Sequence, residues 1–180
     1  MKLIETGIDD LVVLETNAFP DDRGYFFEAF NKKKLKELGL DIEVAQTNVS
    51  KSQKDVVRGL HFQNPPFAQG KLIRVLKGAV LDVAVDIRKS FPTYGKYYSV
   101  ELSEENKFAL WIPEGFAHGF KTLEDDTIFH YDCTDVYNRD AEGSIIWNDP
   151  DIGIDWNIDD PIISEKDSQA PLFKNFVSQF

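Results

Sequence analysis

The segment RGLHFQ, residues 58–63, places an arginine, a glycine, a histidine and an amide within one short stretch. His61 stands out because imidazole changes its charge near neutral pH. The residues alone leave three interpretations open: a general base, a metal ligand, or a histidine packed in a sheet. A base needs an orienting carboxylate and a partner acid. Asp167 and Tyr131 are the candidates for these two roles.

Both candidates also have a purely structural interpretation. Ser164 precedes Asp167 by three residues, a spacing typical of the start of a short helix. Tyr131 alternates with Phe129 and Cys133, and an aromatic residue in that pattern can simply face the core.

A metal site needs several converging ligands. The chain has three histidines, His61, His118 and His130, and none of them forms a His-x-His pair. No glutamate lies four to six residues beyond His61. Three scattered histidines could still converge in space, but the sequence predicts no metal site.

Several residues along the chain are of types that can bind phosphate groups or a nucleobase. Arg23 and Arg58 could clamp phosphate, because the guanidinium fork matches phosphate oxygens, although a surface arginine is the ordinary alternative. Lys71 could hold an enolate oxygen or extend along apolar surface to reach water. Tyr137 and Phe26 could stack on a base or pack normally.

Strand geometry complicates a shared site for Arg58 and His61. On a regular strand these two residues point to opposite faces. Gly59 lies between them and permits a bulge, which would bring both side chains into one cavity.

Composition excludes several classes of protein. The formal net charge of −11 argues against a general nucleic-acid or anionic-membrane binder. One cysteine, Cys133, rules out an intrachain disulfide, and the start MKLIETGIDDLVVLE has no apolar signal core. We therefore expect a cytoplasmic protein with no membrane span.

Short strands separated by turns dominate the chain from residue 44 onward. Residues 80–87, VLDVAVDI, alternate strictly, LKGAV predicts a hairpin around Gly78, and FALWIPEGFAHGF predicts two strands joined by a turn. NKKKLKELGL predicts one short helix that ends at Gly39. The sequence therefore predicts an all-β sandwich or barrel, as a single domain over residues 1–180.

Six motifs resemble, in the same order, those of the dTDP-4-dehydrorhamnose 3,5-epimerase family of the cupin superfamily: DDRGYFFE, QTNVSKS, RGLHFQ, AQGKLIRVLKGAVLDVAVDIRKSFPTYG, LWIPEGFAHGF and GSIIWNDPDIGIDW. The resemblance covers nearly the whole chain. It implies a jelly-roll β-barrel with short peripheral helices that works as a homodimer without metal or cofactor. Members invert both carbons flanking the ketone of dTDP-4-dehydro-6-deoxyglucose, a step towards dTDP-L-rhamnose.

The resemblance also implies roles for individual residues. His61 matches the general base, Asp167 its paired carboxylate, and Tyr131 the acid on the opposite face of the sugar. Lys71 resembles the residue beside the sugar oxygen, with Asp82 in support. Further matches to ligand-contacting positions are Arg23, Glu28, Gln46, Asn48, Arg58, His118, Glu142, Lys166 and Tyr137, the last stacking on thymine. The segment from Arg23 to Glu28 is expected to reach the neighbouring subunit's site.

These residue types suit the chemistry. Removing the proton beside a ketone leaves an enolate, which Lys71 and His118 are candidates to stabilise. Inversion requires proton loss from one face and return from the other, and a tyrosine that titrates near pH ~10 is the protonated partner at neutral pH.

Two positions depart from the family pattern: Val136 and Phe62 stand where many members have tyrosine. They leave the sugar specificity open. One alternative is therefore an epimerase that inverts a single carbon of a related dTDP-ketodeoxysugar. Another is a cupin that binds a ligand or a metal without turnover.

Overall fold

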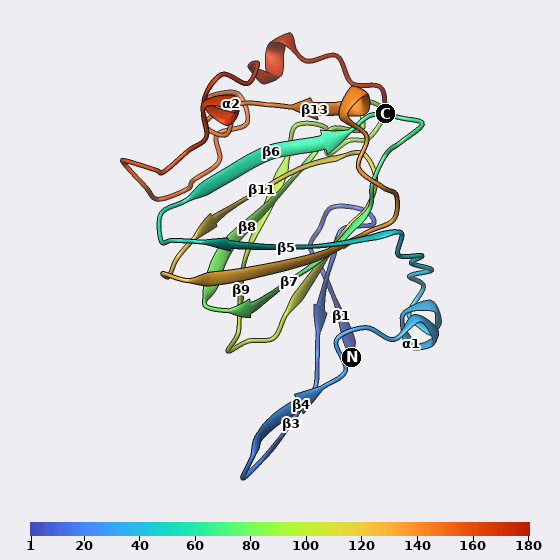
Figure 1. Ribbon diagram of the computed structural model, residues 1–180. Coiled ribbons are helices and arrows are strands. Elements are labelled where there is room, and N and C mark those ends of the chain that lie inside the picture. Colours follow the sequence, from blue (N-terminus) through green and yellow to red (C-terminus); the bar gives the residue numbers. More distant parts are fainter.

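The computed structural model describes residues 1–180 and consists almost entirely of strands (Figure 1). The strands are β1 (Lys2–Glu5), β2 (Val12–Glu15), β3 (Ala18–Asp21), β4 (Gly24–Phe27), β5 (Gln46–Ser52), β6 (Val57–Gln63), β7 (Lys71–Lys77), β8 (Ala79–Asp86), β9 (Tyr97–Ser103), β10 (Ala109–Ile112), β11 (Phe116–Thr122), β12 (Thr127–Cys133) and β13 (Glu142–Ser144). The helices are α1 (Lys32–Glu37) and α2 (Glu165–Ser168), with single 3-10 turns at Arg139–Ala141 and Phe173–Asn175.

Two antiparallel sheets face each other. One has the strand order β1-β2-β10-β7-β12-β5 and the other β13-β6-β11-β8-β9. The core between them includes Ile73 and Phe129 from the first sheet, and Val80, Ala84 and Phe120 from the second. The expected all-β, cupin-type jelly roll with short peripheral helices is therefore confirmed.

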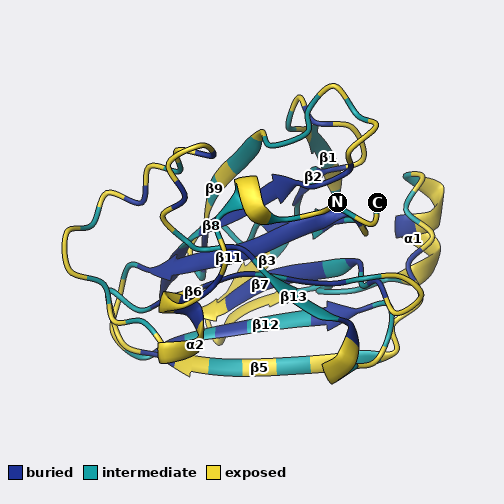
Figure 2. Ribbon diagram, turned by 90° about the horizontal axis from the view of Figure 1, so that it is seen from above, coloured by how far each residue is buried: buried dark blue, intermediate teal, exposed yellow.

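The strand predicted at residues 80–87 is confirmed, but both of its faces are buried (Figure 2). Val83 and Val85 pack outward against a layer that contains Trp156 of the C-terminal segment. Asp82 shares the inner face with Val80 and Ala84 and is fully buried. The polar positions of this alternation thus point into the barrel and not to water.

The hairpin predicted around Gly78 is wrong. β7 and β8 do follow one another across that glycine, whose φ is +76°. They do not pair, however, because β7 belongs to the six-stranded sheet and β8 to the five-stranded one. Local turn chemistry predicts a reversal of the chain, but it does not say whether the second strand returns to the same sheet.

The predicted helix at NKKKLKELGL is confirmed as α1. The side chain of Asn31 accepts a hydrogen bond from the backbone N–H of Lys34 at its start, and Gly39 follows its end with a φ of +91°. Its single buried residue, Leu35, packs with Leu72 on the outer face of the six-stranded sheet. No helix has the length and apolar character that a membrane crossing requires.

The C-terminal segment lies over the outer face of the five-stranded sheet, above β6 in Figure 1. It is attached to that strand at two points. Leu60 and Ile145 exchange backbone hydrogen bonds of 3.0 and 3.1 Å, and the backbone N–H of Val57 donates to the carbonyl of Ile162 at 3.0 Å. Because α2 belongs to this segment, its residues are held beside β6.

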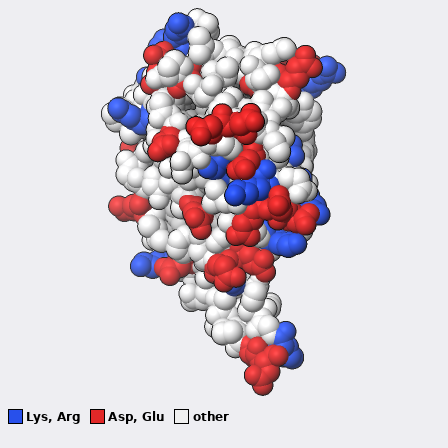
Figure 3. All heavy atoms as spheres, turned by 90° about the vertical axis from the view of Figure 1, so that its left-hand side faces the viewer, with Lys and Arg blue, Asp and Glu red and all other residues white.

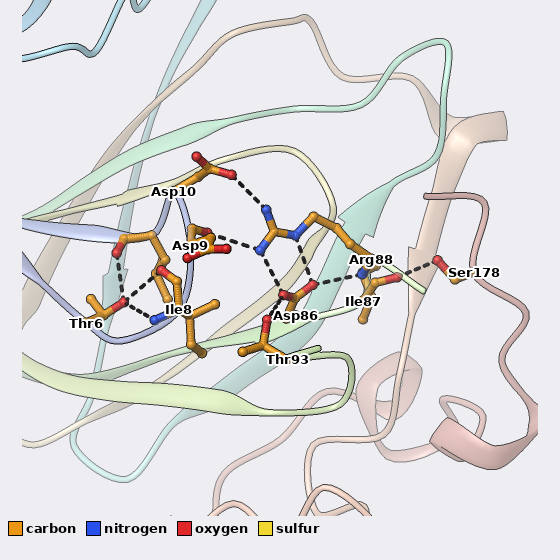
Figure 4. A network of polar contacts seen from close by, with 10 residues as sticks. Thr6, Ile8, Asp9, Asp10, Asp86, Ile87, Arg88, Thr93 and Ser178 are labelled. Atoms are coloured by element: carbon orange, nitrogen blue, oxygen red, sulfur yellow. Dashed lines mark hydrogen bonds and ion pairs between the residues drawn. The ribbon is translucent and has the colours of Figure 1, made fainter. Parts of the chain in front are cut away.

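An ion-pair network closes one end of the barrel (Figure 4). The guanidinium of Arg88 donates to both carboxylate oxygens of Asp86 at 3.0 and 2.8 Å, and to Asp10 at 3.0 Å. Next to it, the Ser178 hydroxyl donates to the carbonyl of Ile87. The network therefore ties the loop before β2, the end of β8 and the C-terminus together.

The β3–β4 hairpin projects away from both sheets (Figures 1 and 3). Its exposed side chains include Phe19, Tyr25 and Phe26, at 62%, 47% and 68% exposure. Asp21 and Arg23 form an ion pair of 2.5 Å at the tip. An apolar arm of this kind buries little against its own chain.

Candidate active site

A bulge in β6 resolves the geometric problem of Arg58 and His61. His118 pairs with His61 and Phe120 with Arg58, so β6 has one residue more than β11 between these pairs. Gly59 allows this with a φ of +131°, and a Cβ there would lie 2.6 Å from the Cα of Gly119. Arg58 and His61 consequently line the same cavity, as the bulge hypothesis requires.

His61 contacts Asp167 directly. Its Nε2 lies 2.7 Å from Oδ1 of Asp167, while Oδ2 accepts a 3.3 Å hydrogen bond from the backbone N–H of Gly59. The backbone N–H of Asp167 donates to the hydroxyl of Ser164 at 3.1 Å. Both interpretations of Asp167 therefore hold at once: its backbone belongs to the helix cap, and its carboxylate contacts the imidazole.

The environment of Asp167 keeps it ionised. Its burial alone would raise the pKa, but hydrogen bonds from His61 and the Gly59 amide outweigh this and hold the pKa below the usual value. A carboxylate can only accept a hydrogen bond. Nε2 of His61 therefore carries a proton, and in the neutral ring Nδ1 keeps its lone pair.

A second histidine–aspartate pair adjoins the same cavity, which is lined by His118 but not by the fully buried Asp82. Nε2 of His118 is 3.0 and 3.1 Å from the two carboxylate oxygens of Asp82. Burial lowers the pKa of His118, although the charge of Asp82 acts in the opposite direction. The His118 imidazole is therefore held neutral, and its Nε2–H donates a hydrogen bond to the carboxylate of Asp82.

The cavity has two connected lobes. The histidine lobe, of about 310 Å³, is lined by Ser50, Arg58, His61, Lys71, His118, Phe120, Phe129, Tyr131, Ser164, Lys166 and Asp167. The amide lobe, of about 150 Å³, is lined by Gln46, Asn48, His61, Phe62, Gln63, Gln69, Lys71, Tyr131, Tyr137 and Glu142. His61, Lys71 and Tyr131 belong to both, so they mark the junction of the lobes.

Tyr131 faces His61 from the opposite wall. It lies on β12 of the six-stranded sheet, whereas His61 lies on β6 of the five-stranded sheet. Burial raises the pKa of the Tyr131 phenol above its usual value. The cavity therefore places a protonated phenol across from an imidazole.

Lys71 is the half-buried lysine of this junction. It begins β7, beside Cys133 of β12. Burial lowers its pKa, while the negative charges of Asp82 and Glu142 act against that shift. Because no carboxylate forms an ion pair with its amine, Lys71 in its protonated form is free to bind a developing negative charge.

Polar contacts surround the amide lobe. The Tyr137 hydroxyl donates to Glu142 at 3.2 Å, and Glu142 also pairs with Lys166 at 2.6 Å. Gln46 donates to the Asn48 side chain at 2.9 Å and accepts from the Tyr137 backbone at 2.8 Å. The Tyr137 ring remains 54% exposed at this lobe, so its face is open to stacking.

Four predicted binding residues do not line this cavity within one chain, and one of them, Asp82, is fully buried beside His118. Arg23 pairs with Asp21 at the hairpin tip, Phe26 is exposed on β4, and Glu28 pairs with Lys34 at 2.6 Å. Glu28 lies one residue beyond the end of β4.

Other lining residues were not predicted as site residues. They are Ser50, Phe62, Gln63, Gln69, Phe120, Phe129 and Ser164. For Ser50 a signal existed, because it continues the alternation of Gln46 and Asn48 on β5. Phe120 and Phe129 carry no such signal, since a core phenylalanine and a cavity phenylalanine look alike in sequence. His130 lines neither lobe, and no group of three or more potential ligand side chains is placed to hold a metal.

The sequence matches the model of the dTDP-4-dehydrorhamnose 3,5-epimerase family over residues 5–175. It is 52% identical to the dTDP-4-dehydrorhamnose 3,5-epimerase of Salmonella typhimurium over 174 residues, which cover 96% of this chain and 95% of the relative.

Solved structures agree with the family match. The epimerase from Legionella pneumophila in complex with dTDP-4-keto-L-rhamnose is 46% identical, with a TM-score of 0.93 and coverage of 98% of this chain and 94% of that one. A 3'-monoepimerase from Streptomyces bikiniensis in complex with dTDP-quinovose is 34% identical, with a TM-score of 0.87 and coverage of 92% and 85%. The chain belongs to the dTDP-4-dehydrorhamnose 3,5-epimerase family.

Proposed function

We propose that this protein epimerises dTDP-4-dehydro-6-deoxy-D-glucose at both carbons flanking the ketone, giving dTDP-4-dehydro-L-rhamnose for dTDP-L-rhamnose synthesis. Family membership supports the reaction. The observation that carries the assignment of residues is that His61 and Tyr131 line one cavity from opposite sheets. A ring bound between them has an imidazole on one face and a phenol on the other.

His61 is the proposed base. Because Asp167 binds the Nε2–H, the lone pair of Nδ1 is available to take the proton from the carbon beside the ketone. The positive charge that forms on the imidazole lies against the carboxylate of Asp167, which stabilises it. Asp167 itself stays ionised throughout.

Lys71 is the proposed stabiliser of the enolate oxygen. Both Lys71 and His118 are candidates on sequence. The single N–H of neutral His118, however, already donates a hydrogen bond to Asp82. The other ring nitrogen can only accept a hydrogen bond, so it cannot stabilise an enolate oxygen. The Lys71 ammonium brings both charge and donors. Tyr131 then gives its proton to the opposite face of the enolate carbon. The imidazolium of His61 loses its proton to solvent and the phenolate of Tyr131 regains one from solvent, which restores both groups for the second carbon.

The amide lobe is the proposed site of the nucleotide. Tyr137 stacks on the thymine ring, while Gln46, Asn48 and Glu142 offer hydrogen bonds to its polar edge and to the deoxyribose. Arg58 and Lys166 provide positive charge for the pyrophosphate. This assignment is supported by the exposed Tyr137 ring and by the amide side chains around it.

We also propose a homodimer in which the segment from Arg23 to Glu28 completes the neighbouring subunit's site. The projecting β3–β4 hairpin, with its exposed aromatic side chains, supports an arm that packs on another copy. Light scattering should report twice the mass of 20.6 kDa. A monomer at micromolar concentration would contradict this part of the proposal.

Two further expectations remain proposals: a cytoplasmic location, which the unpaired thiol of Cys133 supports, and a single domain over residues 1–180.

Incubation with dTDP-4-dehydro-6-deoxy-D-glucose in deuterium oxide, coupled to a reductase that traps the product, tests the reaction. Nuclear magnetic resonance should find deuterium at both carbons that flank the ketone. Deuterium at one carbon would instead support the alternative of a single inversion, for which the Streptomyces bikiniensis neighbour is the structural precedent. No incorporation at either carbon would contradict the proposed function.

A further inference from the structure

The floor of the histidine lobe is apolar. Phe120 of β11 and Phe129 of β12 come from opposite sheets and stack with their ring centroids 4.0 Å apart at 18°. Both are also members of the core between the sheets, with exposures of 5% and 1%. The two rings therefore form the boundary at which the cavity ends and the core begins.

The rest of the lobe is polar. Apart from Phe120 and Phe129, every lining residue carries a hydrogen-bonding group: Ser50, Arg58, His61, Lys71, His118, Tyr131, Ser164, Lys166 and Asp167. The rings of His118 and Tyr131 both lie near Phe129, at centroid distances of 6.1 and 5.8 Å. A bound deoxy sugar has hydroxyls, a ketone and one methyl group, and this floor is the part of the lobe whose side chains carry no hydrogen-bonding group, which matches the methyl.

We propose that Phe120 and Phe129 select the substrate by the substituent on its exocyclic carbon, accepting a methyl group and rejecting a hydroxymethyl group. This inference rests on the proposed function. A methyl group against the two rings buries apolar surface. A hydroxyl at the same place would leave water and meet only ring carbon atoms, which is unfavourable for a group without a hydrogen-bond partner.

Ser50 is the residue that could rescue such a hydroxyl. Its Oγ is buried and has no partner, and the residue pairs with Phe129 across β5 and β12. If Ser50 received a hydroxyl on the exocyclic carbon, the lobe would favour the hydroxymethyl sugar. The two cases predict opposite orders of affinity.

Binding of two unreactive ligands separates these cases. dTDP-quinovose and dTDP-D-glucose differ only in the hydroxyl on the exocyclic carbon, and neither has a ketone, so neither forms an enolate. Isothermal titration calorimetry should find dTDP-quinovose tighter by about 10- to 100-fold, the range expected when an apolar pocket meets an added hydroxyl. Equal affinities, or tighter binding of dTDP-D-glucose, would overturn the proposal.

Two substitutions of similar size locate the effect. Phe120→Leu keeps the floor apolar and should keep the preference for dTDP-quinovose. Phe120→Asn supplies a polar partner and should reduce the preference to less than about threefold. A preference that is unchanged in Phe120→Asn, or lost equally in both variants, would show that the floor does not select the sugar.

Ser50→Ala provides the complementary test. It should leave the ratio of the two affinities unchanged, because the proposal gives Ser50 no contact with the exocyclic carbon. A ratio that rises on removal of the Ser50 hydroxyl would assign the recognition to Ser50 and contradict the proposal. Circular dichroism verifies that each variant is folded before its ratio is compared.

The outcome stays separate from that of the proposed function. If dTDP itself fails to bind, or if no deuterium enters the ketosugar, then the proposed function is wrong. If dTDP binds and the ketosugar exchanges, but dTDP-quinovose and dTDP-D-glucose bind equally, then only the role of the phenylalanine floor is wrong.

Discussion

The two histidine–aspartate pairs at this cavity have similar chemistry in different surroundings. The His61 side chain is 33% exposed and its partner comes from the C-terminal segment that lies over β6. The His118 side chain is 9% exposed, and Asp82 lies fully buried on the adjacent strand β8. One pair is built between two parts of the chain at the cavity wall, and the other lies within a single sheet.

The chemistry available to such a pair depends on how far its histidine is exposed to solvent and substrate. A base must exchange its proton with substrate and solvent, which the partly open His61 can do. His118 is desolvated, which lowers its pKa and keeps it neutral, so it suits a fixed hydrogen-bond acceptor. Substitutions in the two pairs should therefore have effects of very different size.

The largest effect is expected from His61→Ala. With no base there is no enolate, so deuterium exchange at both carbons should fall by about 10³-fold or more. His130→Ala is the matched control, because His130 lies on the same strand as Tyr131 but lines neither lobe. If deuterium exchange in His61→Ala stayed near the wild-type rate, His61 would not be the base.

Tyr131→Phe should separate exchange from inversion. His61 can still form the enolate and return the proton to the same face, so exchange should persist while inversion falls by about 10²-fold or more. Proton–deuterium exchange and product formation are measured in the same sample. Tyr94→Phe, in a loop outside both lobes, serves as the control. Full epimerase activity in Tyr131→Phe would exclude it as the acid.

Asp167→Asn should lower kcat by about 10²-fold, because the amide neither fixes the same imidazole tautomer nor stabilises the imidazolium. The downfield proton resonance of the His61 Nε2–H should disappear in parallel. Since Asp167 also accepts from the Gly59 amide, thermal unfolding is measured to separate stability from catalysis. A kcat within about twofold of wild type would mean that the pair has no part in catalysis.

Asp82→Asn should have a smaller effect, with kcat lower by about tenfold, because His118 accepts a hydrogen bond and does not carry the transferred proton. The pH profile of kcat should keep its shape, since His61 still provides the base. If Asp82→Asn reduced activity as severely as Asp167→Asn, the distinction between the two pairs would be lost.

The smallest effect concerns stability and pH. Burial places the pKa of folded His118 below 6.5, so at mildly acidic pH the unfolded chain binds a proton that the folded chain does not. The stability that this provides is present above about pH 6.5 and is lost as pH falls below it, by at most about 1.4 kcal/mol per unit. Urea unfolding at several pH values measures this slope, which should become shallower in His118→Asn.

The pKa of Asp167 is lowered from 3.8, so the stability that its ionised form provides is lost only in stronger acid.

Much of the fold could be read from local pattern. Alternation in β8 and β12, the Asn31 and Ser164 caps and the turn glycines all act over a few residues. The pairing of strands could not, as the error at Gly78 shows, because it depends on contacts far apart in sequence. Asp167 illustrates the same limit for the site: spacing predicts its helix cap, but its contact with His61 spans 106 residues.

The chemical groups, the strand periods and the presence of a glycine at position 59 that permits a bulge follow from the sequence, because these depend on residue type and near neighbours alone. Long-range packing was needed to show that His61 and Tyr131 line one cavity from opposite sheets, that the Nε2–H of His118 is bound by Asp82, and that Phe120 and Phe129 form the floor. The physical reason is that burial and distance between remote strands set the protonation and the surroundings of each group, and neither is encoded in any short segment.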